Sequence, residues 1–194
     1  MTTQQIKTAT QTEVDQCTAV IMLAFSSDPG VRWMYPNPHQ YLENFPRFVS
    51  AFGGKAFKHG TAQYVDGFLA VALWLPPGVQ PDEEALVTLI ENSVPEGHRE
   101  AVFALFEQIG DYHPNEPHWY LPLIGTESIH QGKGHGSALL RPALAVCDQQ
   151  QTLAYLEATS AMSVPLYQRH GFEILGTIQV STSPPIIPML RKPR

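Results

Sequence analysis

Three glycines alternate with other residues at positions 132, 134 and 136, between a predicted strand and a predicted amphipathic helix. Because glycine has no Cβ, the backbone amides of such a turn can lie very close to a ligand. The free amides and the positive dipole at the start of the helix favour an anion such as a pyrophosphate. This part of the chain is therefore predicted to be a strand–turn–helix unit, and the turn is a candidate ligand site.

Apolar patterns around this turn predict a fold that mixes helices and strands. In the first half of the chain, Asp66-Gly67 between apolar runs predicts a hairpin of residues 62–65 and 68–75. Asp28-Pro29-Gly30 and the prolines that follow it predict a loop up to residue 41. The other expected elements are strands over 6–9, 118–126, 153–158, 172–180 and 186–190, and helices over about 12–27, 41–58, 82–109 with a break near Pro95, 134–150 and 165–170.

These elements predict one α/β (α+β) domain over residues 1–194, in which helices flank a mixed, mostly antiparallel central sheet of about six to seven strands. A chain of 194 residues suits a single domain, because domains usually contain about 100–200 residues. The strand–helix–strand unit late in the chain is where such a fold is expected to bind its ligand.

Composition argues against several classes of partner. The formal net charge is −6 and no run of Lys or Arg stands out, so no nucleic-acid partner is expected. The longest apolar runs, Ala19–Phe25 and Phe68–Leu75, are far shorter than the roughly 18 residues of a membrane span, so no membrane partner is expected. The N-terminus has no apolar signal segment and the chain has two cysteines, which favours a cytoplasmic protein without a disulfide framework.

Two well-known glycine motifs do not fit the turn. A Walker A loop requires Ser or Thr after its Gly-Lys pair, but Gly134 follows Lys133, and Glu127 stands where the loop's first glycine belongs. A dinucleotide-binding fingerprint has the pattern G-x-G-x-x-G at the first strand–helix turn of a domain. The pattern here is G-x-G-x-G and comes late in the chain, so neither class of nucleotide-binding protein is favoured.

The turn instead resembles the acyl-CoA-binding motif [Gln/Arg]-x-x-Gly-x-[Gly/Ala] of the GNAT N-acetyltransferase superfamily, through Gln131, Gly134 and Gly136. Residues 156–176 resemble the next strand, short helix and Tyr-x-x-x-Gly-Phe signature of that superfamily. In motifs, residues 118–194 are similar to puromycin N-acetyltransferases. The resemblance implies a GNAT-like fold and an enzyme that transfers an acetyl group from acetyl-CoA to a small-molecule amine, by direct attack in a ternary complex.

The resemblance also implies which residues hold acetyl-CoA. The turn would bind the pyrophosphate, and the backbone of the preceding strand would pair with the pantetheine arm. Pro122 in that strand is compatible either with a strand that separates from its neighbour or with a simple bulge. Ser163 stands where many relatives have an asparagine that contacts the pantetheine. The expected cofactor-binding residues are Ile124, Gly125, Thr126, Gln131, Gly132, Lys133, Gly134, His135, Gly136, Ser137 and Ser163.

Three residues are candidates for the chemistry, and no metal site is expected. Tyr167 stands at the superfamily's position for the acid that protonates the leaving thiolate; otherwise it anchors a short helix. Glu157, a carboxylate in an apolar strand, is a candidate base or the anchor of a base water; otherwise it is structural. His118, at a strand end, has a suitable ordinary pKa and is a second candidate base.

The acceptor itself is less well defined by the sequence. Seven large side chains between residues 31 and 57 either line an acceptor pocket or belong to the core: Trp33, Met34, Tyr35, Phe45, Phe48, Phe52 and Phe57. Two alternatives to a small-molecule acetyltransferase remain open. One is a catalytically weak sensor that binds acyl-CoA, and the other is an acetyltransferase for protein N-termini or lysines. The sequence leaves the oligomeric state, monomer or homodimer, open.

Overall fold

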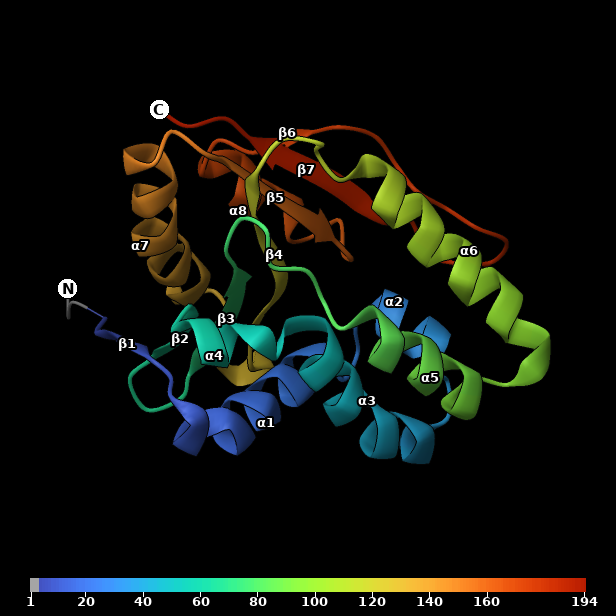
Figure 1. Ribbon diagram of the computed structural model, residues 1–194. Helices are drawn as coiled ribbons and strands as arrows, with labels where there is room; N and C mark the ends of the chain where they lie inside the picture. Colours follow the sequence, from blue (N-terminus) through green and yellow to red (C-terminus); the bar gives the residue numbers. More distant parts are fainter. Residues whose placement is uncertain (1–3) are drawn as a thin grey trace.

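Residues 4–194, the part of the chain that the computed structural model describes, form one seven-stranded sheet with helices on both faces (Figure 1). The strands lie in the order β1-β2-β3-β4-β5-β7-β6. Strands β4 and β5 are parallel, and the other neighbouring pairs are antiparallel. The predicted α/β fold with a mixed, mostly antiparallel sheet is therefore confirmed. The strands are β1 (Ile6–Thr8), β2 (Ala62–Val65), β3 (Ala70–Leu75), β4 (His118–Thr126), β5 (Leu153–Ala158), β6 (Glu173–Ile174) and β7 (Ile187–Arg191).

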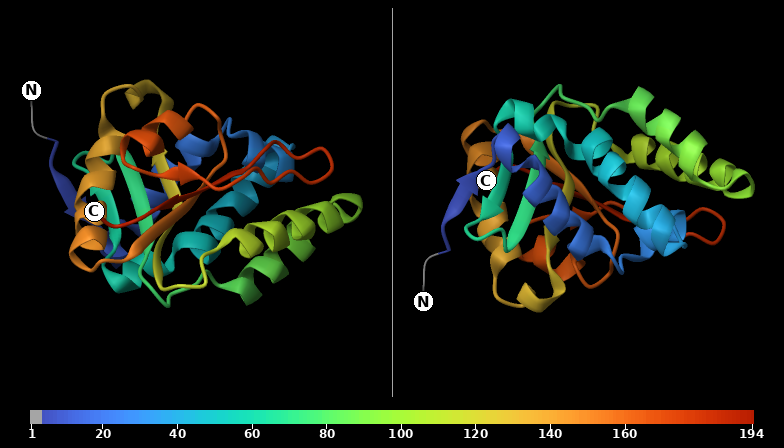
Figure 2. Two further views of the ribbon diagram at one scale, coloured as in Figure 1. Left: turned by 90° about the horizontal axis from the view of Figure 1, so that it is seen from above. Right: turned by 90° about the horizontal axis from the view of Figure 1, so that it is seen from below.

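The helices divide between the two faces of the sheet (Figure 2). Helices α7 and α8 cover one face, and a core of mainly aliphatic side chains with Trp74 and Trp119 lies beneath them. The other helices pack on the opposite face over a core rich in Phe and Tyr side chains. The helices are α1 (Val14–Phe25), α2 (Pro29–Met34), α3 (Pro38–Gly53), α4 (Lys55–His59), α5 (Glu83–Ser93), α6 (Glu96–Tyr112), α7 (His135–Gln149) and α8 (Val164–Arg169), with 3-10 turns η1 (Gln11–Glu13) and η2 (Ser128–His130).

The loop predicted up to residue 41 is wrong, because its prolines begin helices. The Asp28 side chain accepts a hydrogen bond from the Val31 amide at 3.0 Å and caps α2. Pro29 occupies the first turn of α2, where a backbone amide would have no partner within the helix. Helix α3 likewise begins with Pro38, capped by Asn37.

The strand predicted over residues 172–180 is also wrong beyond residue 174. Strand β6 ends at Ile174, and after it only an isolated bridge joins Ile178 to Ile186. Gly176 packs so closely on the ring of Tyr112 that a side chain at this position would collide with it. The chain therefore leaves the sheet here and runs alongside α6 (Figure 1), where Ile178 and Ile186 form a small separate core with Leu105.

Among residues 4–194, no helix is both long enough and apolar enough to cross a membrane.

Candidate functional site

The parallel strands β4 and β5 separate part of the way along, which opens a gap in the middle of the sheet. They pair over His118–Tyr120 and Leu153–Tyr155. Beyond that point β4 follows β3 as far as Thr126, whereas β5 follows β7 as far as Ala158. The two strand edges that face this gap can pair with an extended ligand, as edge strands do with peptides.

Pro122 lies where β4 bulges. Leu75 of β3 pairs with Tyr120 and Leu73 pairs with Leu123, so β4 has one residue more than β3 between the two pairs. The strand thus both bulges and separates from β5, which combines the two interpretations of Pro122. The extra residue brings Tyr120 and Leu123 to the same face of the sheet, the face of the aromatic core.

The glycine-rich turn lies between the end of β4 and the start of α7. Gly132 and Gly134 have φ angles of +74° and +84°, which side chains with a Cβ rarely adopt. Among the described residues, nothing lies within 4 Å of where a Cβ would stand at either position, so the turn has an open surface. Gln131 Nε2 donates to the Thr126 carbonyl at 3.1 Å, and Lys133 Nζ donates to a carbonyl of η2 at 3.0 Å. These bonds hold the turn in shape.

Three other residues expected to contact the cofactor have packing contacts of their own. A Cβ on Gly125 would collide with Ala24 of α1, so glycine allows this helix to lie close to β4. A Cβ on Gly136 would stand 2.9 Å from a methyl group of Leu166, so glycine allows α8 to lie close to α7. The Ile124 side chain packs on the core beneath α7. Only the backbone of these residues remains for a ligand.

Three polar side chains near the turn differ in their partners. Ser137 Oγ lies 2.9 Å from His170 Nε2, which links α7 to the end of α8. Ser163 Oγ donates to the Ser160 carbonyl at 2.7 Å, just before α8. The His135 side chain is buried, and neither ring nitrogen has a hydrogen-bond partner among residues 4–194. Burial lowers the pKa of His135, and the nearby His130 and Lys133 add to this effect.

Strand β5 carries Glu157 into the interior, on the face of the aromatic core. Its side chain is only 6% exposed. Tyr120 Oη donates to Glu157 Oε2 at 2.9 Å, and His113 Nε2 lies 3.2 Å from Glu157 Oε1. The contact with His113 is close enough for an ion pair when this histidine is protonated, but it lacks the direction of a hydrogen bond, so Oε1 has no hydrogen-bond donor among the described residues. A buried carboxylate oxygen with unused acceptor capacity fits an amine ligand.

Two tyrosines beside Glu157 keep their protons at neutral pH. Burial, reinforced by the Glu157 carboxylate, raises the pKa of Tyr120 well above its ordinary value. The same two causes, in the same order, raise the pKa of Tyr155. Tyr120 is therefore a permanent hydrogen-bond donor that fixes one oxygen of Glu157 and leaves the other free.

A pair of histidines continues from Glu157 toward the loop before β4. His118 Nδ1 lies 2.9 Å from the Glu116 carbonyl, which can only accept, so His118 carries its hydrogen on Nδ1. When His118 is neutral, its Nε2 then accepts from His113 Nδ1, 3.2 Å away. A neutral His113 would therefore turn a lone pair toward Glu157 Oε1. A proton that Glu157 takes up can therefore pass on to His113.

Burial lowers the pKa of His118, and the charge of His113 lowers it further, whereas the Glu116 carbonyl opposes the shift. His118 itself is 9% exposed and lies behind His113 as seen from Glu157. His113 thus lies between His118 and Glu157, so this candidate base does not contact the carboxylate.

Tyr167 lies on α8, which covers the face of the sheet opposite to the aromatic core and Glu157. It is buried against Phe172 in an edge-to-face contact, with ring centroids 6.1 Å apart. Burial raises the pKa of Tyr167 to about 12. The phenol therefore keeps its proton throughout the neutral range.

An apolar cavity of about 80 Å³ lies beside Glu157. Helices α1, α2, α3 and α6, strands β4 and β5, Thr159 and Ile186 form its walls, and Glu157 is the only acidic or basic residue among the residues that line it. Four of the seven large side chains considered from the sequence line it, whereas the other three belong to the core. The lining residues are Phe25, Gly30, Val31, Trp33, Met34, Phe48, Phe52, Val102, Leu105, Phe106, Ile109, Pro122, Leu123, Glu157, Thr159 and Ile186.

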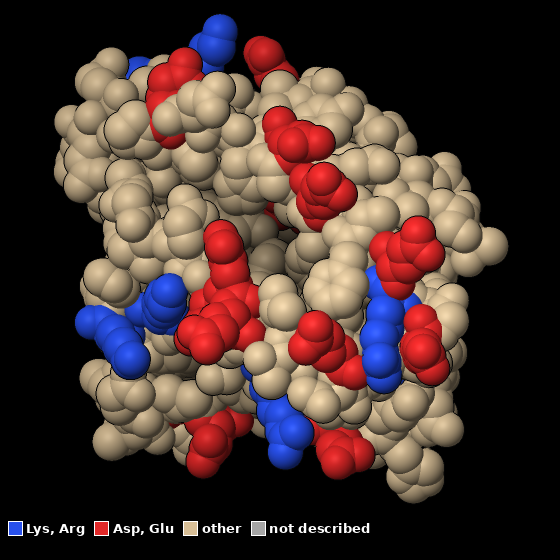
Figure 3. Space-filling model, turned by 45° about the vertical axis from the view of Figure 1, so that its right-hand side comes forward, with Lys and Arg blue, Asp and Glu red and all other residues tan. Residues whose placement is uncertain are grey.

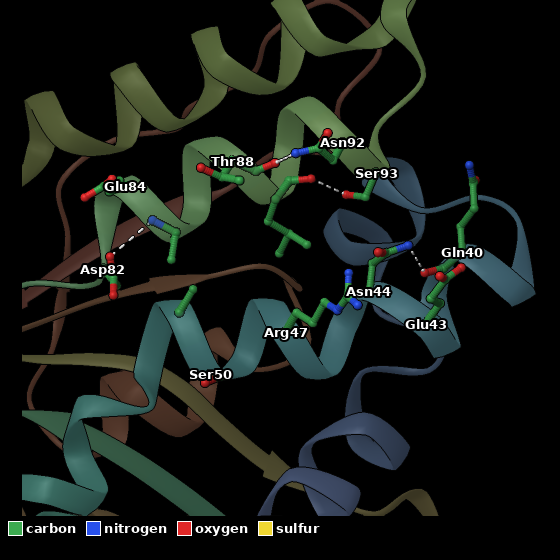
Figure 4. A pocket seen from close by; sticks show the side chains of 13 residues that line it. Gln40, Glu43, Asn44, Arg47, Ser50, Asp82, Glu84, Thr88, Asn92 and Ser93 are labelled. Atoms are coloured by element: carbon green, nitrogen blue, oxygen red, sulfur yellow. Dashed lines mark hydrogen bonds between the residues drawn. The ribbon is translucent and has the colours of Figure 1, made fainter.

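A wider groove of about 800 Å³ runs between α3 and α5 (Figure 4). Its polar side chains bond to their own helices: Asn44 to the Gln40 carbonyl and Asn92 to the Thr88 carbonyl. Asp82 accepts from an amide of α5 and caps that helix. These groups stabilise the two helices and do not converge on a common point, so the groove is a weaker candidate than the cavity at Glu157.

The sequence did not identify His113 as a functional residue. It lies at the end of α6 and reaches Glu157 only because α6 ends above β5, a contact between segments far apart in the chain. In the part of the chain that the structure describes, no three His, Cys, Asp or Glu side chains are grouped as metal ligands would be.

Comparisons with known proteins agree with this geometry. Residues 80–172 match the model of the acetyltransferase (GNAT) family. An uncharacterized N-acetyltransferase of Schizosaccharomyces pombe is 26% identical over 90% of this chain and 78% of its own length. A Corynebacterium glutamicum protein, described as histone acetyltransferase HPA2 and related acetyltransferase, has a TM-score of 0.70 at 26% identity and covers 99% of this chain and 97% of its own. A Drosophila melanogaster polyamine N-acetyltransferase that forms N-acetylagmatine shares the fold, with a TM-score of 0.69 at 13% identity over 97% and 99% of the two chains.

Proposed function

We propose that this chain, whose residues 80–172 match the GNAT acetyltransferase family model, transfers the acetyl group of acetyl-CoA to the amino group of a small molecule. The observation that carries this proposal is Glu157, which lines an apolar cavity and whose buried oxygen Oε1 has no hydrogen-bond donor among residues 4–194. The amine would lie in this cavity. The Drosophila melanogaster polyamine N-acetyltransferase, which forms N-acetylagmatine, has the same fold and supports a small amine as acceptor.

The residues present fit acetyl-CoA, which would supply the acetyl group as an activated thioester. The open turn at Gly132–Ser137, at the start of α7, would hold the pyrophosphate with its backbone amides. The free edge of β4 at Ile124–Thr126 would pair with the pantetheine arm. Ser163 is already bonded to the Ser160 carbonyl, so we expect it to contribute little to binding.

Glu157 would take the proton from the amine. An alkyl amine with a pKa near 10.4 is mostly protonated at pH 7 and must lose a proton before it can attack. Oε1 is the free oxygen, since Tyr120 occupies Oε2. With His113 neutral, the proton would pass from Glu157 Oε1 to His113 Nε2, and the Nδ1 proton of His113 would pass to His118 Nε2. His118 would then release its Nδ1 proton to solvent beside the exposed Glu116.

Tyr167 would donate a hydrogen bond to the sulfur as it becomes a thiolate. With a pKa of about 12, it is a weaker acid than an ordinary thiol, whose pKa is about 8.5. Complete proton transfer from Tyr167 to the thiolate is therefore unfavourable. We propose that Tyr167 stabilises the negative charge without giving up its proton, which narrows the role expected from the sequence.

Direct transfer, without an acetylated enzyme, agrees with the state of both cysteines. Cys17 and Cys147 are fully buried, and burial raises the pKa of each to about 12. Neither provides a thiolate near neutral pH, and a thiolate is the form that attacks a thioester.

The charge of the molecule also favours a cationic acceptor. Eight Asp and Glu residues but a single Arg lie between residues 82 and 111, the segment of α5 and α6. Acidic side chains lie on either side of a hollow on the face that includes these helices (Figure 3). Such a field raises the rate at which protonated amines arrive.

Calorimetric titration with acetyl-CoA, followed by thiol release with a panel of amines that includes puromycin, tests this function. We expect binding of acetyl-CoA and turnover of at least one amine. Glu157→Gln should keep acetyl-CoA affinity but lower kcat/KM roughly 100-fold, the usual contribution of a general base. Glu91→Gln removes an exposed carboxylate from α5 and is the matched control. Binding without any turnover would favour the sensor, and equal activity of the Glu157→Gln variant would remove Glu157 from the chemistry.

A further inference from the structure

The walls of the cavity beside Glu157 are apolar wherever the body of an acceptor would lie. Trp33 of α2, Phe52 of α3 and Phe106 of α6 approach it from three helices. Trp33 is held on two sides: its indole nitrogen donates to Thr182 Oγ1 at 3.1 Å, and the His98 ring packs edge-on against it with centroids 4.3 Å apart. The cavity is thus a fixed apolar pocket built from separate segments of the chain.

The charge in this cavity is limited to one carboxylate. The other acid nearby, Asp28, accepts bonds from the Val31 amide and the Thr159 hydroxyl, which fix it as the cap of α2. Burial raises the pKa of Asp28, which further disfavours a second anion in this region. Thr159, the other polar side chain at the wall, is turned toward Asp28. No other group among the residues lining the cavity can neutralise a second cation.

We infer that the acceptor is an apolar monoamine, an alkylamine or arylalkylamine with one basic nitrogen, and that the cavity discriminates against diamines and polyamines. This inference rests on the proposed function and names its substrate class. One nitrogen would meet Glu157 Oε1, and the apolar body would lie among the aromatic walls. A second ammonium group would lose its water among these walls without gaining a partner, which is strongly unfavourable.

Hexylamine and 1,6-diaminohexane form a matched pair for the test, because they have the same carbon chain and differ by one amino group. With the wild-type protein at pH 7.5, we expect kcat/KM for hexylamine to exceed that for the diamine by about 100-fold or more. Phenylethylamine should be used at least as well as hexylamine. Calorimetric binding of each amine in the presence of CoA should show the same preference without requiring turnover.

A variant that adds a carboxylate to the cavity should reverse part of this preference. Ile109 lines the cavity and is half-buried on α6, so Ile109→Glu places an acid at the wall with limited damage to the core. The preference for hexylamine should fall at least about tenfold. Gln108→Glu adds the same charge on the exposed side of α6 and should leave the preference unchanged.

The outcomes separate this inference from the function on which it rests. Equal or better use of the diamine, with turnover intact, overturns the inference and leaves the acetyltransferase proposal standing. Selective binding of hexylamine without turnover of any amine supports the inference and contradicts the proposed function. If neither amine binds to the protein with CoA present, the inference is overturned.

Discussion

The contacts of Glu157 explain how a carboxylate can lie in an apolar interior and still act. Tyr120 satisfies one oxygen, and His113 lies beside the other, where it balances the charge when it is protonated. Burial of a carboxylate without such partners would cost several kcal/mol. The same partners that make burial tolerable also fix the position of the side chain at the cavity wall, so stability and chemistry depend on one arrangement.

His113 should act as a proton carrier for this carboxylate. His113→Phe keeps a ring against Tyr120 and Tyr155, whose centroids lie 4.6 and 4.4 Å from that of His113, but removes both nitrogens. We expect kcat to fall roughly tenfold in dilute buffer, because the proton leaves Glu157 more slowly. Added imidazole should restore much of the rate, as measured by thiol release.

The exposed His39 supplies the control, since His39→Phe should need no rescue. A His113→Phe variant that is slow but indifferent to imidazole would indicate that His113 only positions Glu157. A variant with the full wild-type rate would show that the histidine pair plays no part in turnover.

Glu157 could be predicted as a candidate functional residue from the sequence, since a carboxylate within an apolar strand requires a partner or a role. The sequence could not indicate His113, because nothing in the residues near position 113 shows that α6 ends above β5. The relation between His118 and Glu157 was also hidden, since the two residues lie on parallel strands with a long crossover between them.

At the scale of elements, close packing between α1 and β4 holds one wall of the gap in the sheet. Gly125→Ala would bring a methyl group against Ala24, and α1 would have to move. We expect the free energy of unfolding to fall by about 1–3 kcal/mol, the usual cost of overpacking. Because α1 carries Phe25 into the cavity, acceptor KM should rise as well. Chemical denaturation and steady-state kinetics measure the two effects.

Gly110→Ala is the matched control, because this glycine lies within α6 with nothing beside it among the described residues. The added methyl group should stabilise the protein by roughly 0.5–1 kcal/mol, since alanine favours a helix more than glycine does. If Gly125→Ala were as stable as the wild type, α1 would have to be free to shift, and the fixed gap would lose its support.

The elements that the sequence predicted well are those whose pattern is local. Residues 118–126 and 153–158 form strands with the predicted bounds, because buried strands are read from short apolar runs between turn residues. Prolines in the segment before α3 are compatible with a loop and with the first turn of a helix. The capping hydrogen bond of Asp28, seen in the structure, distinguishes the two. The segment after Ile174 leaves the sheet because of Tyr112, a contact that no local pattern contains.

At the scale of the whole molecule, two buried histidines and one half-buried histidine should make stability depend on pH. Burial lowers the pKa of His118, His135 and His170 below the ordinary value of about 6.5. As the pH falls through 6.5, the unfolded chain binds protons at these sites and the folded protein does not. Stability therefore rises with pH in this range and is lost toward acid. We expect the free energy of unfolding to fall by roughly 1–3 kcal/mol between pH 7.5 and 5.5.

His135→Leu separates this effect from a general acid sensitivity. Both ring nitrogens of His135 are buried without partners among residues 4–194, so an apolar residue of similar size removes a site that resists protonation. The variant should lose less stability than the wild type over the same pH interval, measured by urea denaturation at both pH values. His39→Leu, at an exposed position, should follow the wild-type curve. An unchanged pH dependence in His135→Leu would show that this ring already reaches solvent protons in the folded protein, and the turn before α7 would then be more open than its contacts indicate.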